Sequence, residues 1–269
     1  MSRRRPRDGG VPAPLLVPAL LAVAFLVLPL AGLVVRAPWS ELGPQLTRPG
    51  VGEALRLSLV SATLATVVSL LLGVPLAWVL ARSQVRGRSV LRALVTVPLV
   101  LPPVVGGVAL FLVLGRQGVI GRWLFETTGF SLPFTTAAVV VAETFVAMPF
   151  LVISVEGALR AADARFEDAA ATLGADRWTT FRRVTLPLVA PGIAAGAVLC
   201  WARALGEFGA TITFAGNFPG TTQTMPLAVY LALQRDPDAA IVLSLVLLAV
   251  SLATLLLLRG RWLGRGATA

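Results

Sequence analysis

The sequence contains no histidine and no lysine, and Cys200 is its only cysteine. These absences exclude a metal cluster of histidine and cysteine, a Ser-His-Asp or Cys-His catalytic unit, and an intrachain disulfide. The phosphate-binding loop of nucleotide hydrolases needs a lysine that reaches the terminal phosphates, so that loop cannot occur here. We therefore expect no catalytic residue and no metal site on this chain, and a buried position for Cys200.

Charged residues are also scarce, at 13% of 269 positions against 57% hydrophobic residues. Most of such a chain cannot face water. A helix that spans a bilayer needs about 20 mainly apolar residues. Six stretches reach that length: about 15–35, 54–81, 91–114, 134–158, 188–209 and 239–258. The predicted fold class is all-α, a polytopic membrane protein with about six transmembrane helices within residues 15–258.

The net charge of +10 comes entirely from arginines, which lie in short clusters between the apolar stretches. Short clusters between apolar stretches fit membrane topology better than a nucleic-acid-binding surface, so we expect no nucleic-acid partner. On one side of the bilayer the predicted topology places Arg3 to Arg7, Arg82, Arg86, Arg88, Arg92, Arg160, Arg165, Arg177, Arg182, Arg183, Arg259, Arg261 and Arg265. The opposite side receives Arg36, Arg48, Arg116, Arg122 and Arg235.

The positive-inside rule assigns the side richer in arginine to the cytoplasm. Both termini are then cytoplasmic, with an N-terminal segment at 1–14 and a tail at 259–269. The arginine-rich start also resembles a cleavable secretory signal, but its apolar stretch is longer than a signal core and ends without a small-residue cleavage site. We expect that stretch to stay as the first span.

The longest predicted cytoplasmic loop, residues 159–187, has the pattern of a helix-turn-helix. Asp163 is expected to cap a helix with Glu167 and Asp168 in its first turns, where acids suit the positive end of the helix dipole. Ala169, Ala170 and Ala171 continue that helix, and Gly174 can end it in a left-handed cap. Asp176 can cap a second helix with Trp178, Phe181 and Val184 on one face. The alanine face suits docking in another protein's groove.

This loop resembles the EAA loop of ABC importer permeases in Asp168-Ala169-Ala170, Gly174, Val184 and Leu186-Pro187. Asp168 and Val184 stand where that family has Glu and Ile, and Glu167 offers the longer carboxylate beside Asp168. The resemblance implies a type I ABC importer permease fold, with the loop seated in a cleft of a separate ATPase subunit that binds ATP and magnesium. The implied contact residues are Glu167, Asp168, Ala169, Ala170, Leu173, Gly174, Ala175 and Phe181.

The last third of the chain refines the resemblance. The run from Ala202 to Phe214, with Asn217, Pro219-Gly220 and Thr224-Met225-Pro226, looks like the molybdate permease subfamily, as do residues 98–107. Sulfate and tungstate permeases share the Arg-x-x-Gly-Glu-Phe-Gly core, so they remain alternatives. The resemblance further implies a second copy of the chain, an extracytoplasmic substrate-binding protein and no cofactor on the permease itself.

Arg203 and Glu207 lie one helical turn apart in an apolar segment, where charges usually face protein or a water-filled cavity. One interpretation is a mutually satisfied pair that locks the helix to its neighbours. The other is that Arg203 lends positive potential to an anion pathway, with Glu207, Thr211 and Thr213 at an outer gate. Glu143 and Glu156 also lie in an apolar stretch, and we expect Glu143 to face protein.

The prolines and glycines within the predicted spans have two interpretations as well. They can mark bends that line a path, or kinks that serve packing alone. The residues concerned are Pro75, Pro98, Pro102, Pro103, Gly106, Gly107 and Pro149. Two other classes predict different sequences: an ion-coupled secondary transporter would show internal repeats, and a membrane-embedded enzyme would show clustered His, Asp or Lys. Neither signal is present.

Overall fold

The computed structural model describes residues 13–83 and 85–262, and all regular structure in these residues is helical. The predicted terminal segments 1–14 and 259–269 therefore lie largely outside the described residues. Five helices are long and apolar enough to cross a membrane, and a bent pair makes a sixth crossing if it is counted as one span. The predicted all-α class with about six spans is confirmed.

The long helices fall on the predicted apolar stretches. They are α1 (Ala13–Val35), α3 (Val51–Arg82), α7 (Thr136–Ala161), α10 (Leu186–Leu205) and α13 (Pro237–Trp262). The shorter elements are η1 (Trp39–Glu41), α2 (Leu42–Leu46), α4 (Arg88–Val100), α5 (Pro103–Leu114), α6 (Val119–Thr128), α8 (Arg165–Thr172), α9 (Arg177–Thr180), η2 (Phe181–Thr185), α11 (Gly209–Phe214) and α12 (Met225–Arg235). The sequence did not indicate α2, α6, α11 or α12, which are too short for a span.

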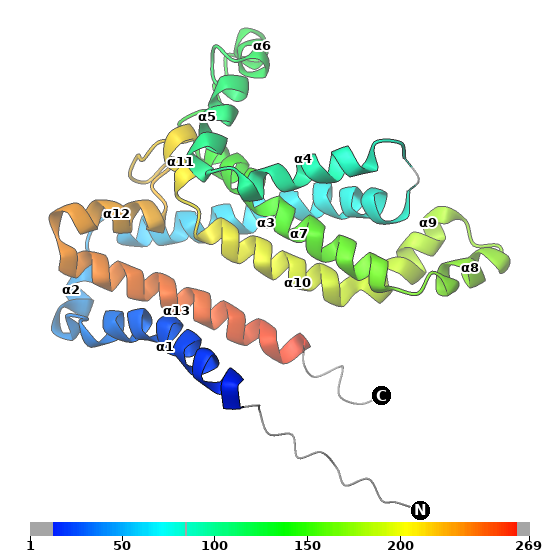
Figure 1. The fold of residues 1–269 in the computed structure, drawn as a ribbon. Helices are drawn as coiled ribbons and strands as arrows, with labels where there is room; N and C mark the ends of the chain where they lie inside the picture. Colours follow the sequence, from blue (N-terminus) through cyan, green and yellow to red (C-terminus); the bar gives the residue numbers. More distant parts are fainter. Residues whose placement is uncertain (1–12, 84, 263–269) are drawn as a thin grey trace, which may run out of the picture.

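The centre of the molecule is formed by α3, α7 and α10, which run side by side (Figure 1). Their contact faces carry small residues that let the helix backbones approach closely. A Cβ added at Gly73 would lie 3.1 Å from the side chain of Val152, and one at Gly196 would lie 3.0 Å from that of Leu151. Cys200 is fully buried among these helices, as predicted.

The predicted span at 91–114 is present as a bent pair of helices. It is divided into α4 and α5, whose axes are bent by 116°. Leu101 has an extended backbone with ψ 131°, and Pro102 and Pro103 follow it. A residue before proline is kept out of the helical region because the proline ring clashes with it, which explains the break. The expectation that prolines here mark a bend is confirmed at this pair.

The predicted span at 188–209 also has different ends. Its helix stops at Leu205, while at the other end α9, the π-helical turn η2 and α10 form one continuous helix from Arg177 to Leu205. The second helix of the predicted helix-turn-helix is therefore not a separate element. It is the extension of the span itself.

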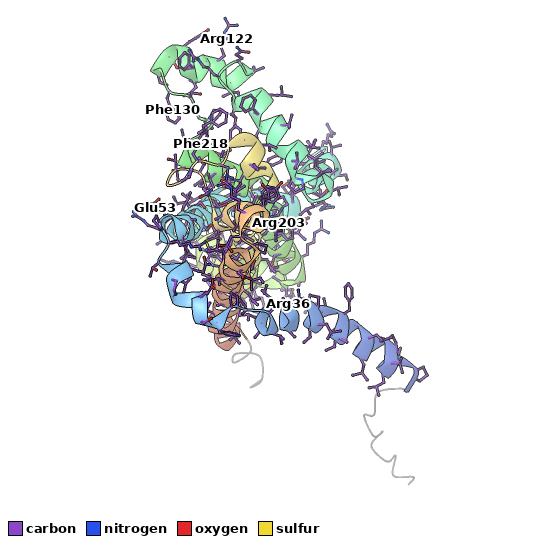
Figure 2. The ribbon with its side chains drawn as sticks, turned by 90° about the vertical axis from the view of Figure 1, so that its left-hand side faces the viewer. Arg36, Glu53, Arg122, Phe130, Arg203 and Phe218 are labelled. Atoms are coloured by element: carbon purple, nitrogen blue, oxygen red, sulfur yellow. The ribbon has the colours of Figure 1, made fainter. Side chains whose placement is uncertain are left out.

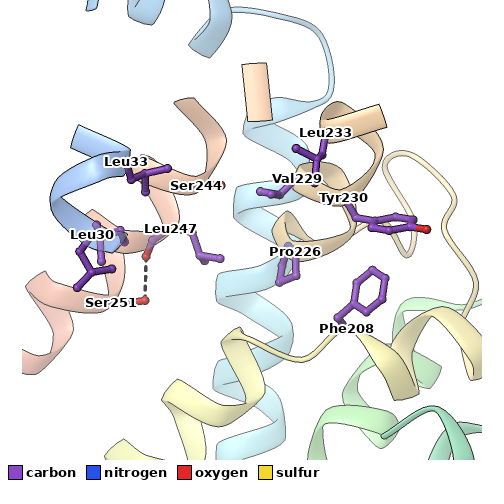
Figure 3. Close-up of a pocket in the computed structure, with 11 residues that line it drawn as sticks. Leu30, Leu33, Phe208, Pro226, Val229, Tyr230, Leu233, Ser244, Leu247 and Ser251 are labelled. Atoms are coloured by element: carbon purple, nitrogen blue, oxygen red, sulfur yellow. Dashed lines mark hydrogen bonds between the residues drawn. The ribbon is translucent and has the colours of Figure 1, made fainter. Parts of the chain in front are cut away.

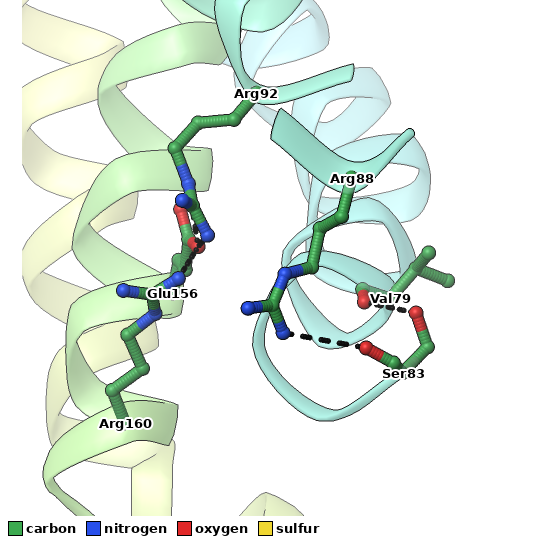
Figure 4. Close-up of polar contacts among 6 residues, drawn as sticks. All are labelled: Val79, Ser83, Arg88, Arg92, Glu156 and Arg160. Carbon is green, nitrogen blue, oxygen red and sulfur yellow. Dashed lines mark hydrogen bonds and ion pairs between the residues drawn. The ribbon is translucent and has the colours of Figure 1, made fainter. Parts of the chain in front are cut away.

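Arg92 of α4 pairs with Glu156 of α7 and holds the first half of the broken span against α7. The Oε1 atom of Glu156 lies 2.6 Å from Arg92 Nη2 and 2.8 Å from Arg160 Nη2 (Figure 4). Arg88 donates a hydrogen bond of 3.3 Å to the carbonyl of Ser83 near the turn that precedes α4. The Arg92 and Arg88 contacts fasten α4 at the end where α3 and α4 are joined, whereas Arg160 pairs with Glu156 within α7 itself.

Helix α1 stands apart from the rest of the molecule. It leaves the bundle near Arg36 and extends away from it (Figure 2). None of its membrane-spanning window is buried within the chain. An apolar helix without a polar face is normal where lipid or another subunit surrounds it, because the bilayer supplies the apolar environment that water does not.

Candidate functional site

The loop between α7 and α10 is built by two local capping motifs. Gly174 has φ +85°, and the N–H groups of Ala175 and Gly174 donate to the carbonyls of Ala170 and Ala171 at 3.0 Å. This is a Schellman motif, and it ends α8 as predicted. Asp176 then accepts the N–H of Thr179 at 2.7 Å, which confirms the predicted cap of the second helix.

The cap at the start of α8 differs slightly from the prediction. Asp163 does not occupy the N-cap position, which falls on Ala164. The Asp163 carboxylate still accepts the N–H of Arg165 at 3.0 Å, two residues downstream. The side chain thus satisfies the first amide of the helix from one position further out, because an aspartate readily bonds the backbone two residues ahead of it.

The two acids of α8 point in different directions. Glu167 is turned inward, where its Oε1 lies 3.2 Å from Arg82 Nη2 on α3 and accepts the hydroxyl of Thr185 at 3.1 Å. Asp168 is exposed. Glu167 therefore ties α8 to the end of α3 and to η2, while Asp168 keeps an exposed carboxylate that forms no ion pair with the described residues and lines the same cavity as Glu167.

Apart from Asp168, Arg165 and Thr172, the exposed residues of α8 are small or apolar. Ala169 is exposed, Leu173 is 89% exposed, and Phe166 is 56% exposed. Ala170 and Ala175 are half-buried at the base of this surface. An exposed apolar patch with a carboxylate beside it is typical of a docking surface. Phe181 lies behind it, between the rings of Trp78 and Trp178.

A second group of predicted residues lies where α10 ends and α11 begins. Arg203 Nη1 is 2.6 Å from Glu207 Oε2, and only 1% of the Glu207 side chain is exposed. The other oxygen of Glu207 accepts the N–H of Ala210 at 2.8 Å. One carboxylate thus pairs with the last turn of α10 and caps the first turn of α11, so it joins the two helices across the break at Gly206.

The two predicted gate threonines occupy different surroundings. Thr211 is fully buried, and its hydroxyl has no hydrogen-bond partner among the described residues. Thr213 donates to the carbonyl of Gly209 at 2.8 Å and lies against α5. A Cβ added at Gly107 of α5 would be 2.8 Å from the carbonyl oxygen of Ala210, so α5 and α11 are in backbone contact there.

Ser58 and Ser61 of α3, which the sequence analysis did not single out, extend this group together with Glu143 of α7. Ser61 donates to Glu143 Oε1 at 2.8 Å, and the N–H of Met225 donates to Ser58 at 2.7 Å. Glu143 is 1% exposed, so it faces protein as predicted. Its other oxygen and the Thr224 hydroxyl lack hydrogen-bond partners within the described part of the chain. Serines are common in apolar helices, and only the packing shows which of them meet a carboxylate.

One apolar hollow of about 550 Å³ lies between α1, α12 and α13 (Figure 3). Leu30 and Leu33 face Val229, Leu247 and neighbouring side chains across it, and its lining contains no charged residue. A hollow of this kind cannot hold an anion, because nothing in it replaces the water around the charge. It fits lipid or another helix instead.

Comparison with known proteins places this arrangement in a family. The family described as "Binding-protein-dependent transport system inner membrane component" matches residues 69–268, which cover the α8 loop and the α10–α11 junction. The chain belongs to this family. This inner membrane component is therefore a multi-pass permease, which agrees with the resemblance drawn from the EAA-like loop.

Curated relatives cover most of the permease. The Molybdenum transport system permease protein ModB of Mycobacterium tuberculosis is 52% identical over 235 residues, which are 87% of this chain and 89% of the relative. The protein of the same description from Escherichia coli is 42% identical and covers 79% and 93% of the two chains. The Sulfate transport system permease protein CysT of Escherichia coli is 36% identical, with coverages of 88% and 86%.

Solved structures agree on the fold. A bacterial ABC transporter involved in the import of the acidic polysaccharide alginate has a chain with a TM-score of 0.71 to this one, at 19% identity and 95% coverage of both chains. The MetNI methionine ABC transporter has a chain with a TM-score of 0.59, at 19% identity, which covers 79% of the permease and 93% of that chain. The permease thus has the fold of ABC importer permeases.

Proposed function

We propose that this permease carries molybdate across the cytoplasmic membrane as the membrane subunit of an importer whose ATP is hydrolysed by a separate subunit. The observation that carries the proposal is the 52% identity to a molybdenum transport permease over 87% of the chain, against 36% to a sulfate permease over a similar length. The oxyanions are alike in shape and charge, so sulfate transport is the second candidate. Tungstate is a third anion to be tested in the same assay.

The exposed surface of α8 is the proposed contact with the ATPase. It offers Asp168, Ala169 and Leu173 to a partner, while Glu167 is engaged inside the permease. Asp168 is therefore the acid that we assign to the contact. Because the helix from Arg177 to Leu205 is continuous, a displacement of this loop would be transmitted to the α10–α11 junction along a single helix.

The α10–α11 junction is the proposed position of the outer gate. Arg203 is partly exposed while its partner Glu207 is buried, so part of the guanidinium faces away from the pair. Such a group lends positive potential to a passing anion without binding it tightly, as a conduit requires. Tight binding of molybdate belongs to an extracytoplasmic binding protein, and a second copy of the permease would complete the path. The arginine distribution supports a cytoplasmic position for both termini.

The test is anion-specific transport by vesicles that contain the permease, its ATPase and its binding protein. We expect molybdate to be accumulated and to stimulate ATP turnover, with sulfate a weak competitor. Stimulation by sulfate without a response to molybdate would reject the substrate.

Docking is tested separately by co-purification of the ATPase. Asp168→Asn should weaken co-purification, whereas Asp163→Asn should not, because Asp163 is an exposed acid of the same loop that bonds within its own turn. Equal retention of the ATPase by both variants would remove Asp168 from the contact.

A further inference from the structure

Glu143, Glu156 and Glu207 are the buried acidic residues of the described chain, and Glu143 differs from the other two. Glu156 pairs with two arginines (Figure 4), and Glu207 pairs with one. Glu143 belongs to none of the ion pairs that the described residues form. It is therefore a buried carboxyl group whose charge, if it were ionised, no cation compensates.

The hydrogen bonds of Glu143 are also few. The Ser61 hydroxyl donates to Oε1 at 2.8 Å, but its one hydrogen is shared with the carbonyl of Ser58 at 3.3 Å. Oε2 is buried and accepts no hydrogen bond from any residue that the structure describes. An ionised carboxylate can accept about four hydrogen bonds, so most of this capacity is unused.

The neighbours of Glu143 across the nearest helices offer no cation. The carboxylate of Glu207 is near enough to act on Glu143 and would have the same sign. Arg203 is already engaged by Glu207. Neither α5 nor α11, which both pack against α7, contains a charged residue.

The charged residues of the other helices that contact α7 are each exposed or bonded to a different residue. They are Glu53, Arg56 and Arg82 of α3, and Arg88 and Arg92 of α4. Glu143 itself is only 1% exposed within the single chain. Lipid, a second copy of the permease or a passing anion therefore does not reach its side chain.

An ionised carboxylate is unfavourable in such a position, because burial removes its water and nothing replaces the lost interactions. A neutral carboxyl group avoids this cost, and its O–H is a donor where the ion has an unused acceptor. We propose that Glu143 is a neutral carboxylic acid in the folded permease, and that its contact with Ser61 positions α7 against α3 without a charge in the interior.

The neutral state has a consequence for the α10–α11 junction. With Glu143 neutral, the charges of Arg203 and Glu207 cancel each other. An ionised Glu143 would add a negative charge within range of this pair, and that charge would oppose the passage of an anion. This consequence rests on the proposed function, whereas the protonation state of Glu143 does not and is measured without transport.

The experiment compares infrared spectra of the unaltered full chain and of Glu143→Gln, both in lipid vesicles at neutral pH. We expect the difference spectrum to contain the C=O stretching band of a protonated carboxyl group, which the variant lacks. Glu156→Gln is the matched control, because Glu156 is a buried glutamate of the same helix that pairs with two arginines. Its difference spectrum should contain carboxylate bands instead. Carboxylate bands for Glu143→Gln as well would overturn the proposal.

Melting temperatures of the same chains give a second measurement. Glu143→Gln should keep the melting temperature of the unaltered chain, because the amide has the size and the neutrality of the acid. Glu143→Ala should lower it by about 5 °C or more, because the contact with Ser61 is lost and a cavity remains. A marked rise for Glu143→Gln would mean that the unaltered chain carries an uncompensated charge, and a fall as large as that of Glu143→Ala would mean a compensated one. Either result would contradict the neutral state.

Discussion

Glu207 is the residue on which the junction of α10 and α11 depends. Its two oxygens are used separately, one by Arg203 and one by the N–H of Ala210, in a position that is almost entirely buried. A buried carboxylate is tolerated when a cation and hydrogen bonds compensate its charge. The spacing of Arg203 and Glu207 alone suggested the pair, but not the second bond that caps α11.

The two interpretations of Arg203, a structural ion pair and a charge that faces the anion pathway, predict different uptake by variants of the pair. Arg203→Gln leaves Glu207 buried without its cation, and we expect a loss of about 3–5 kcal/mol in stability. Adding Glu207→Gln removes the uncompensated charge and keeps an acceptor for Ala210, so the melting temperature in detergent should largely recover. If Arg203 also lends potential to the pathway, molybdate uptake by the double variant stays low despite the recovered stability.

Uptake restored together with stability would mean that the pair is structural only. Melting temperature and molybdate uptake must be measured on the same preparation, because a chain that fails to assemble with its ATPase also fails to transport. The double variant supplies this control internally, since it differs from the single variant only in the charge at residue 207.

Gly107 is a second residue with a defined role. A Cβ at this position would meet Thr213 and, at 2.8 and 3.0 Å, the backbone oxygen and Cα of Ala210. The threonine side chain can rotate away, but the backbone of α11 cannot move without disturbing Glu207. We expect Gly107→Ala to cost about 1–3 kcal/mol, as an overpacked interior does, and to lower the melting temperature.

The control for this substitution is Gly157→Ala in α7, where nothing lies within 4 Å of the added Cβ. That change should be neutral or stabilise by up to about 1 kcal/mol, because alanine favours the helix. A melting temperature of Gly107→Ala equal to that of Gly157→Ala would show that α5 and α11 are not in the close contact described.

At the scale of elements, α9 begins with a cap that depends on pH. The hydrogen bonds from Thr179 hold the pKa of the Asp176 carboxyl below its ordinary value of 3.8. A lowered pKa in the folded state means that the cap stabilises the loop above pH 3.8 and loses this contribution as the pH falls through the lower value. Asp176→Ala removes the cap at every pH.

We therefore expect the unaltered chain to be more stable than Asp176→Ala at neutral pH, and the difference to shrink only below about pH 4. The measurement is the melting temperature of both chains over a pH series in the same detergent. A difference that shrinks near pH 7 would instead require a group that titrates there, and the assignment to Asp176 would be wrong.

At the scale of the whole molecule, the α8 loop lies at one end of the helix bundle and the polar α10–α11 junction lies at the other. The α8 loop is joined to α3 by the ion pair of Glu167 and Arg82. The junction lies between α10 and α11, and the helix from Arg177 to Leu205 connects the two. No part of the described chain contains a loop suited to bind ATP, so the driving motion is proposed to come from a partner.

Vesicles that contain the permease alone should then show no concentrative uptake of molybdate. Adding the ATPase and the binding protein should produce uptake that stops when ATP is withheld. Dissipating the proton and sodium gradients should leave this uptake unchanged, because the proposed mechanism uses neither. Uptake by the permease alone, driven by an ion gradient, would return the chain to the class of secondary transporters.

The sequence by itself determined the features that depend on near neighbours along the chain. These include the positions of the long apolar helices, the left-handed glycine at Gly174, the cap at Asp176 and the pair of Arg203 with Glu207. Each follows from hydrogen bonds or apolar content within a few residues, which a single sequence displays directly.

Only the tertiary structure decided which distant residues meet. Arg82 and Glu167, Arg92 and Glu156, and Ser61 and Glu143 are each separated by more than 60 positions. Which faces of two apolar helices touch depends on small residues and ridge packing, and lipid-facing and protein-facing sides are equally hydrophobic in sequence. Pro102 and Pro103 indicated a bend in the sequence, but its angle of 116°, and the continuity of α9 with α10, became visible only in the folded chain.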